Sequence, residues 1–216
     1  MTEKNAQRAH RSIAIVDDPL YWQALGKFIE KYASTEAVIF NTLASCCGIS
    51  IKTAQSIFSG TRTIQAMEFL RRINEANNIT DEKQRELEEY VFPQLANITA
   101  LRNHLLHYGS FVTSDAGRIS SDISRAHTPK KIREMRTSVE ILEHAIRDIE
   151  KINSHLISHL VLVNAPFDQR ARIFPNLLAA WQYKHQLSPP KKAHKSLQKD
   201  QSKKTERGAP RKASQK

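Results

Sequence analysis

The sequence predicts an all-α protein: an up-and-down bundle of four to five helices with a short β-hairpin insertion and a disordered basic C-terminal tail. Apolar residues recur at three- and four-residue steps through most of the chain, which is the spacing of amphipathic helices. Glycine is scarce, at 6 of 216 residues, which argues against all-β, collagen-like and wholly disordered proteins. Positive charge is concentrated near the C-terminal end, which separates a tail from the folded part.

The distribution of charge sets the predicted domain boundaries. The net charge is +11, but residues 185–216 hold ten Lys and Arg against two Asp and Glu, which leaves only +3 for residues 1–184. The tail has almost no large aliphatic residue and no aromatic one, so it lacks the apolar surface that offsets the entropy of ordering. We therefore expect a flexible N-terminus at residues 1–16, a helical domain at residues 17–183 and a disordered tail at residues 184–216.

The basic tail is a candidate for binding an anionic partner such as RNA, because clustered cations attract phosphates in a salt-dependent way. The candidate RNA-binding residues of the tail are Lys191, Lys192, Lys195, Lys203, Lys204, Arg207, Arg211 and Lys212.

Two helical passes are predicted for the first third of the chain. Asp17 and the residues after it suit the first turn of a helix whose apolar face continues until Gly48. A second pass covers residues 51–77, with an interruption near Ser59 and Gly60.

A third helix is predicted from Thr80 to Gly109, with a kink or short interruption at Pro93. The next residues, 111–120, alternate like a short hairpin around an Asp/Gly turn.

A long fourth helix is predicted to start at Thr128, as N-cap, with Pro129 in its first turn, and to end at Pro166. A short amphipathic segment around residues 177–181 precedes the tail.

Two charged residues fall where the helical pattern calls for aliphatic ones. Glu36 lies at the centre of the apolar face of the first helix, and Arg102 continues the seam of Leu95 and Ile98 on the third. A buried charge is costly unless it is paired, so one hypothesis is a structural ion pair between Glu36 and Arg102. The other is that both side chains reach solvent from the edge of the bundle.

Arg102, Asn103 and His107 form an Arg-x4-His motif near the end of the third helix, which Gly109 terminates. With this motif and the layout of helices around it, the chain resembles the HEPN superfamily of small helical proteins. The resemblance implies a dimeric helical domain that, in active members, is a metal-independent endoribonuclease. It also implies catalytic roles for Arg102, Asn103 and His107.

The residue types suit that chemistry. A His exchanges protons near neutral pH, and so serves the 2′-OH or the leaving oxygen of RNA. An Arg stabilises negative charge developing on the phosphate, and Asn103 orients the His or the phosphate. On a regular helix Arg102 and His107 lie about 140° apart. One chain is therefore expected to present them together only if the helix end unwinds, or if a homodimer forms a shared site.

Several functional hypotheses stay open. The leading one is an RNA-binding protein, with metal-independent endoribonuclease activity of a toxin or phage-defence type and an antitoxin or defence-system partner. Its alternative is a non-catalytic dimeric interaction module with a nucleic-acid-binding tail, in which Arg102 pairs with Glu36 and His107 caps its helix. In a third hypothesis, the protein binds nucleic acid through its basic tail alone. In toxin members a Tyr follows the motif His by two places, where this chain has Gly109.

Other patterns argue against cofactor, metal and membrane classes. No phosphate-binding glycine loop is present, and no apolar stretch approaches the ~18 residues of a membrane span. His155 and His159 have metal-compatible spacing but are expected on a solvated face, and His104 is also expected to be exposed. The adjacent Cys46 and Cys47 suit a reducing compartment, so we expect a cytoplasmic protein with no cofactor and no membrane partner.

Overall fold

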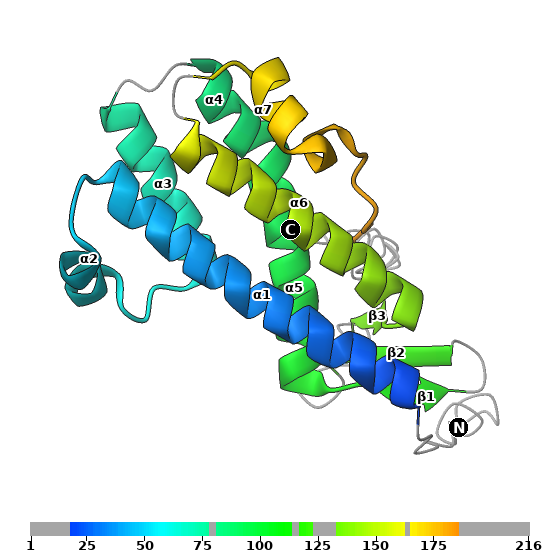
Figure 1. Ribbon diagram of the computed structural model, residues 1–216. Coiled ribbons are helices and arrows are strands. Elements are labelled where there is room, and N and C mark those ends of the chain that lie inside the picture. Colours follow the sequence, from blue (N-terminus) through cyan, green and yellow to red (C-terminus); the bar gives the residue numbers. More distant parts are fainter. Residues whose placement is uncertain (1–17, 78–80, 114–116, 123–132, 163–164, 186–216) are drawn as a thin grey trace, which may run out of the picture.

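The computed structural model describes residues 18–77, 81–113, 117–122, 133–162 and 165–185. The predicted flexible N-terminus at residues 1–16, and residues 186–216 of the predicted tail, lie outside these ranges. The described chain is mostly helical with a small antiparallel sheet at one end, which confirms the helical class and the presence of a hairpin (Figure 1).

The two longest helices, α1 (Pro19–Cys46) and α6 (Val139–Val161), pack along each other and run in the same direction from the sheet end (Figure 1). Both begin with a side-chain cap that satisfies a first-turn N–H. Asp18 accepts from the backbone of Tyr21 at 3.1 Å, and Ser138 accepts from that of Ile141 at 3.3 Å. The core lies between these helices and α5 (Phe92–Tyr108).

The second predicted pass forms two helices, α2 (Ile51–Phe58) and α3 (Thr63–Ala76), and the predicted break between them is confirmed. The start of α3 contacts the middle of α1, through Thr63 and Glu36. Its end contacts the end of α1, through Asn77 and the carbonyl of Cys46. These contacts show that α1 and α3 run in the same direction, with α2 as a short crossing link. The predicted up-and-down alternation is therefore wrong for this part of the chain.

The third predicted helix is a continuous ribbon of α4 (Asp81–Glu86), the π-helical η2 (Leu87–Val91) and α5 (Phe92–Tyr108). Proline lacks the N–H of a regular helix and crowds the preceding turn. The helix accommodates Pro93 with a π turn directly before it, in which the backbone N–H of Phe92 donates to the carbonyl of Leu87. α5 ends at Gly109, whose φ of 65° favours glycine, as the sequence predicts.

The predicted hairpin is confirmed as β1 (Phe111–Thr113) and β2 (Gly117–Ser121), with Phe111 opposite Ile119. A third strand, β3 (Glu134–Arg136), pairs antiparallel with β2 and was not expected. The predicted helix start at Thr128 and Pro129 lies outside the described residues. A continuous helix from there is nevertheless wrong, because the backbone of Glu134–Arg136 pairs with β2 and α6 begins only at Val139.

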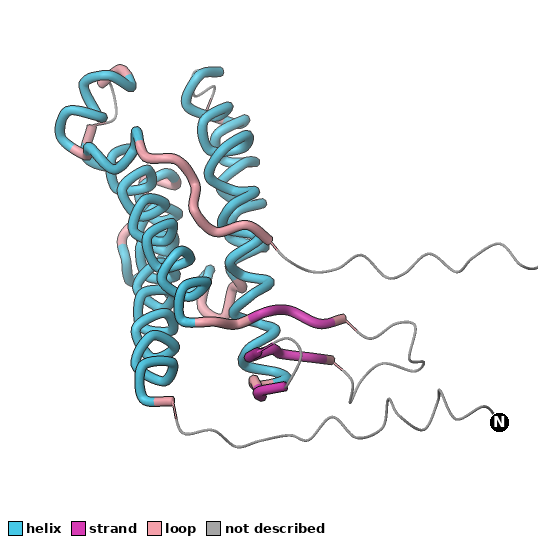
Figure 2. Tube along the Cα trace, turned by 90° about the vertical axis from the view of Figure 1, so that its right-hand side faces the viewer, coloured by secondary structure: helices cyan, strands magenta, loops and turns pink. Residues whose placement is uncertain are grey.

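The chain after α6 covers a second flank of that helix. α7 (Phe167–Ile173) and the 3-10 turn η4 (Pro175–Leu178) precede a loop that runs along the helices toward the sheet end (Figure 2). Asp148, 1% exposed, holds this loop by accepting from the backbone N–H groups of Gln182 and Tyr183 and from the amide of Gln94, at 2.7–3.1 Å. The predicted amphipathic segment at 177–181 begins in the last residues of η4 and continues into this loop, and α6 is covered on more than its apolar stripe.

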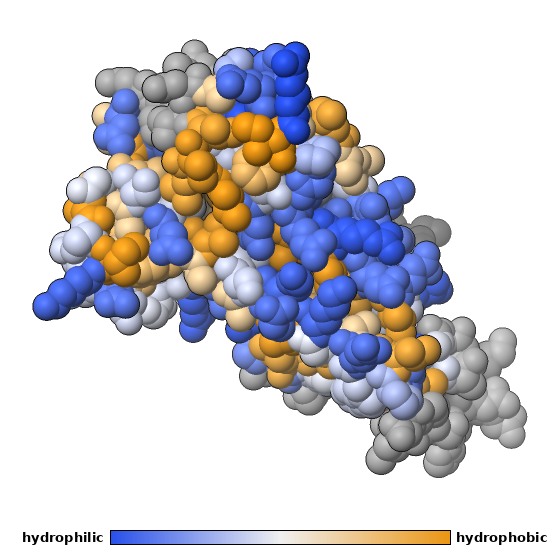
Figure 3. Space-filling model, viewed as in Figure 1, coloured by the Kyte–Doolittle hydropathy of each residue, from blue (hydrophilic) through white to orange (hydrophobic). Residues whose placement is uncertain are grey.

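Figure 3 shows polar side chains along the middle of α1 and apolar ones gathered where α1 and α6 end. Among the described residues no single helix is long and apolar enough to cross a membrane. α1 and α2 meet the length and composition criterion only as a pair, and the chain bends by 111° between them.

Candidate functional site

A groove of about 930 Å³ opens between α1, the link from α2 to α3, the start of α3 and α5. It contains all three residues of the Arg-x4-His motif and also the seam residue Glu36. The polar side chains that line it include Tyr32, Glu36, Arg62, Thr63, Thr99, Arg102, Asn103 and His107.

A chain of hydrogen bonds centred on Tyr32 forms the floor of the groove. The Tyr32 hydroxyl is 2.9 Å from Thr63 Oγ1 and 3.0 Å from Thr99 Oγ1. Thr63 in turn donates to Glu36 Oε1 at 3.1 Å. Burial raises the pKa of Tyr32, with its hydrogen bonds to Thr63 and Thr99 opposing, so the phenol keeps its proton at neutral pH. The chain of hydroxyls links helices α1, α3 and α5 and ends on the Glu36 carboxylate.

Glu36 and Arg102 face the same groove but are not an ion pair among the described residues. Glu36 is bound by Thr63, and the Arg102 guanidinium instead lies 5.3 Å above the ring of Tyr32 and donates to Asn103 Oδ1 at 3.0 Å. The predicted direct pairing is therefore not formed: Thr63 binds the Glu36 carboxylate, and the Tyr32–Thr99 contact joins α1 and α5 where the ion pair was expected. Half-buried Arg102 and exposed Glu36 both line the open groove, as the solvent-reaching alternative describes.

His107 occupies the last turn of α5 and is exposed. Its ring lies beside that of Tyr108, with centroids 6.3 Å apart, and within the described residues it makes no hydrogen bond or ion pair. α5 stays helical up to Tyr108, so the motif reaches one groove without unwinding. Asn103 lies between Arg102 and His107 around the helix and bridges the angle that separates them.

The groove favours an anion. Arg62 and Arg102 supply two guanidinium groups, and Glu36 is the carboxylate among the lining side chains. The first turn of α3, residues 63–65, presents backbone N–H groups that have no acceptor inside the helix, at its positive end. An oxyanion entering here would meet both kinds of donor.

The sequence interpretation missed Tyr32, Thr63 and Thr99. The sequence did contain a signal for Thr99. It lies four residues after Leu95 and three before Arg102, which places its hydroxyl on a helix seam that already carries one charge. A second polar residue on an apolar seam predicts a partner on a neighbouring helix.

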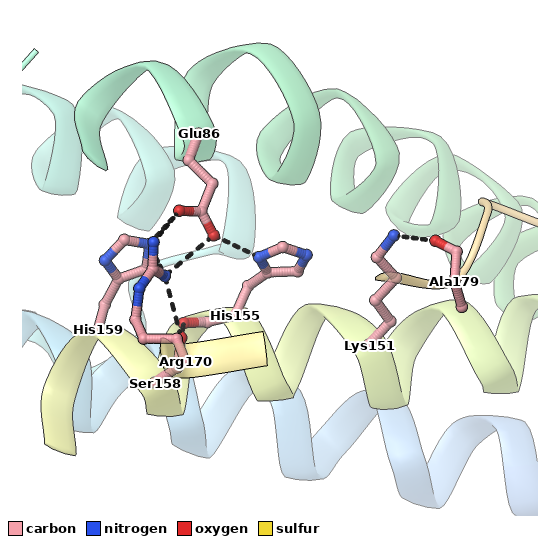
Figure 4. Close-up of polar contacts among 7 residues, drawn as sticks. All are labelled: Glu86, Lys151, His155, Ser158, His159, Arg170 and Ala179. Atoms are coloured by element: carbon pink, nitrogen blue, oxygen red, sulfur yellow. Dashed lines mark hydrogen bonds and ion pairs between the residues drawn. The ribbon is translucent and has the colours of Figure 1, made fainter. Parts of the chain in front are cut away.

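A second polar cluster, which we call the Glu86 cluster, joins Glu86, His155, His159 and Arg170 (Figure 4). Glu86 Oε1 is 2.6 Å from His155 Nδ1, and Glu86 Oε2 accepts from Arg170 Nη2 at 2.5 Å. His159 Nε2 lies 3.5 Å from Glu86 Oε2. The expectation that His155 and His159 face solvent is wrong, because α4 and α7 cover this flank of α6.

Arg170 is 1% exposed, and its guanidinium balances the charge of the Glu86 carboxylate. In the part of the chain that the structure describes, no group of three or more His, Cys, Asp or Glu side chains is arranged to hold a metal ion. Burial raises the pKa of Glu86, but hydrogen bonds from His155, His159 and Arg170 outweigh it and hold the pKa well below its ordinary range. Glu86 is therefore ionised throughout the physiological range.

His104 is also buried, at 7% exposure, and not exposed as expected. Its Nδ1 is 2.9 Å from Ser120 Oγ on β2, because the sheet folds against this side of α5. Burial lowers the pKa of His104, with Asp122 opposing, so the ring is neutral at pH 7. His104 joins α5 to the sheet and does not belong to the groove.

Comparison with known proteins finds no protein-family model, curated protein or solved structure that matches the chain.

Proposed function

We propose that the protein is a HEPN-like RNA-binding domain that cleaves RNA without a metal ion, and that a homodimer is its active form. The observation that carries the proposal is the shared groove, which is lined by Arg102, Asn103 and His107, the last with no hydrogen bond among the described residues. The antitoxin or defence-system partner and the cytoplasmic setting belong to the same proposal, on the resemblance alone.

In this mechanism a phosphodiester lies between Arg102 and the first turn of α3, where guanidinium and backbone N–H groups bind its oxygens. His107 removes the proton of the adjacent 2′-OH, and that oxygen attacks phosphorus. The bond from phosphorus to the 5′ oxygen breaks, leaving a 2′,3′-cyclic phosphate. The leaving 5′ oxygen takes a proton from an imidazolium, which in a dimer is His107 of the second copy.

The chain of hydroxyls beneath the groove helps to position the Arg102 guanidinium. The Arg102 guanidinium lies over the Tyr32 ring and donates one N–H to Asn103 Oδ1, and the side chain lines the groove. Because Glu36 is bound by Thr63, the positive charge of Arg102 is left available for a phosphate.

The test is incubation of the full chain with single-stranded RNA in EDTA, with analysis of the product ends. We expect fragments ending in 2′,3′-cyclic phosphate, and a loss of about 100-fold or more in rate for His107→Ala. His144→Ala is the matched control, since it removes a half-buried histidine of α6 that lies outside the groove. Intact RNA between about pH 6 and 8, or unchanged cleavage by His107→Ala, overturns the proposal.

Binding without cleavage would favour the non-catalytic interaction module. In that case a truncation that removes residues 191–216 separates tail from groove. Salt-sensitive RNA binding that disappears on truncation assigns it to the tail, while binding that survives truncation but is lost in Arg102→Met assigns it to the groove.

The dimer is tested by the mass of the full chain in solution. A monomer at the concentrations at which RNA is cleaved would overturn the two-copy version of the mechanism.

A further inference from the structure

A second hollow, which we call the aromatic pocket, lies next to the Glu86 cluster, between α4–η2, α6, α7, η4 and the loop that carries Trp181. Its volume of about 340 Å³ falls within the range of small-molecule sites. Tyr90, Phe167 and Trp181 give it aromatic walls, and His155 and Lys151 contribute polar atoms from α6. None of these side chains has a role in the proposed RNA groove.

His155 is the main reason to regard this pocket as a binding site. The residue is 3% exposed, its Nδ1 is held by Glu86 at 2.6 Å, and its Nε2 is buried with no hydrogen-bond partner. Figure 4 shows the ring between Glu86 and Lys151, with Nε2 on the Lys151 side. Buried polar atoms are nearly always paired, so a fixed imidazole with one bare nitrogen at a pocket indicates a missing partner.

The aromatic walls define the shape of that partner. The ring of Trp181 lies 6.0 Å from that of His155, and Lys151 Nζ lies 4.0 Å above the Trp181 ring. Tyr90 is 58% exposed, so one wall is formed by a large ring with little packing of its own. A flat ring entering between these side chains would stack on at least one of them.

The charges define its polarity. Glu86 is neutralised by Arg170, and the nearby Asp148 is occupied by N–H donors of the C-terminal loop. Lys151 and, at the rim, Arg85 are the cations that line the pocket. Burial lowers the pKa of Lys151, with Asp148 opposing, and an anion beside its ammonium group would offset that burial.

We propose that the aromatic pocket binds a planar aromatic ligand that carries a negatively charged group. Its ring stacks on Trp181, its anionic group meets Lys151 and Arg85, and a polar edge pairs with His155 Nε2. A nucleoside monophosphate and an aromatic carboxylic acid share this chemistry, and the probes below distinguish them.

The two tryptophans of the chain make the test direct, because Trp22→Phe leaves Trp181 as the sole tryptophan reporter. Trp22 is 49% exposed at the start of α1, so its replacement leaves the pocket intact. The emission of Trp181 is followed while AMP or phenylacetate is added, with adenosine and phenylacetamide as uncharged counterparts. Calorimetry of the same titrations provides a second measurement.

We expect saturable quenching by at least one anionic probe and at least tenfold weaker binding of its uncharged counterpart. AMP as the tighter probe identifies the nucleotide class, and phenylacetate the aromatic acids. Lys151→Met keeps the aliphatic stem but removes the charge, and should weaken the anionic probe at least tenfold. Because Lys151 also donates to the carbonyl of Ala179, Arg85→Gln at the exposed rim is a second variant, expected to weaken the anionic probe severalfold.

Arg72→Gln, which removes an equally exposed arginine on α3, is the matched control and should leave binding unchanged. The absence of saturable binding of all four probes up to about 10 mM overturns the proposal. So does equal affinity for charged and uncharged probes, or anionic affinity that Lys151→Met and Arg85→Gln both leave unchanged.

Discussion

Replacing Arg170 and Arg102 in turn by methionine distinguishes an arginine that stabilises the fold from one that is available to bind a ligand. Arg170 donates to Glu86 Oε1 at 3.1 Å, to Glu86 Oε2 at 2.5 Å and to Ser158 at 3.2 Å, and is 1% exposed. Arg102 is half-buried and has no carboxylate partner among the described residues. Methionine keeps most of the aliphatic stem at both positions and removes the guanidinium.

Arg170→Met leaves the Glu86 carboxylate buried without its arginine. Removing one partner of a buried ion pair costs about 3–5 kcal/mol in the free energy of unfolding. For a chain of this size that corresponds to a decrease of roughly 6–20 °C in Tm. Arg102→Met loses one hydrogen bond and a cation–π contact near solvent, so we expect a loss of about 1 kcal/mol.

Urea unfolding and thermal unfolding, both followed by circular dichroism, measure the two variants. A double variant, Glu86→Leu with Arg170→Met, removes the stranded charge and should recover most of the lost stability. The reasoning fails if Arg170→Met is within about 1 kcal/mol of the wild type, or if Arg102→Met is as damaging as Arg170→Met.

The Glu86 cluster also predicts a pH dependence. The folded state lowers the pKa of Glu86 below its ordinary 4.5, so the ion pairs stabilise the fold fully above about pH 4.5. This stabilisation is lost as the pH falls from there through the folded pKa. Glu86→Gln should flatten that part of the stability profile, and an unchanged acid slope in the variant would contradict the assignment.

Three further predictions concern α1 and α5. Tyr32→Phe removes the hydroxyl between Thr63 and Thr99 but keeps the ring under Arg102, and should lower the free energy of urea unfolding by about 1–3 kcal/mol. Because burial lowers the pKa of His104 below 6.5, wild-type stability should fall between pH 7.5 and 5.5, and His104→Asn should fall less over the same range. Gly109→Ala forces φ 65° and ψ −162° on a residue with a side chain, and a Tm unchanged by this substitution would refute the expected cost of about 1–3 kcal/mol.

The helices were predictable where local signals and burial agree. Asp18 and Pro19 start α1, Gly109 ends α5, and the Ser59–Gly60 break separates α2 from α3, all as capping and turn chemistry indicate. β3 was not predictable in the same way. It has only three residues, and its pairing with β2 depends on a partner at another point of the sequence.

Glu86 shows why the second cluster escaped the helical pattern. At 100° per residue, nine residues separate Glu86 from Leu95 by about 180°, which puts Glu86 on the side opposite the seam. The π turn at Leu87–Val91 contributes one extra residue per turn and rotates Glu86 by roughly 100° toward the core. Periodicity carries no sign of that rotation, although Pro93 marks the place where it occurs.

The carboxylates of buried Glu86 and exposed Glu36 have opposite consequences for their neighbouring arginines. In the Glu86 cluster the carboxylate binds Arg170 directly, so the positive charge of Arg170 is paired and helps to hold α4, α6 and α7 together. In the groove the Glu36 carboxylate is bound by Thr63, while the Arg102 guanidinium lies over the Tyr32 ring without a carboxylate partner among the described residues, so it keeps donors for a ligand. A charge on an apolar seam therefore indicates function only when its partner is elsewhere engaged. By that criterion Arg102 is the arginine to test for RNA, and Arg170 the one to test for folding.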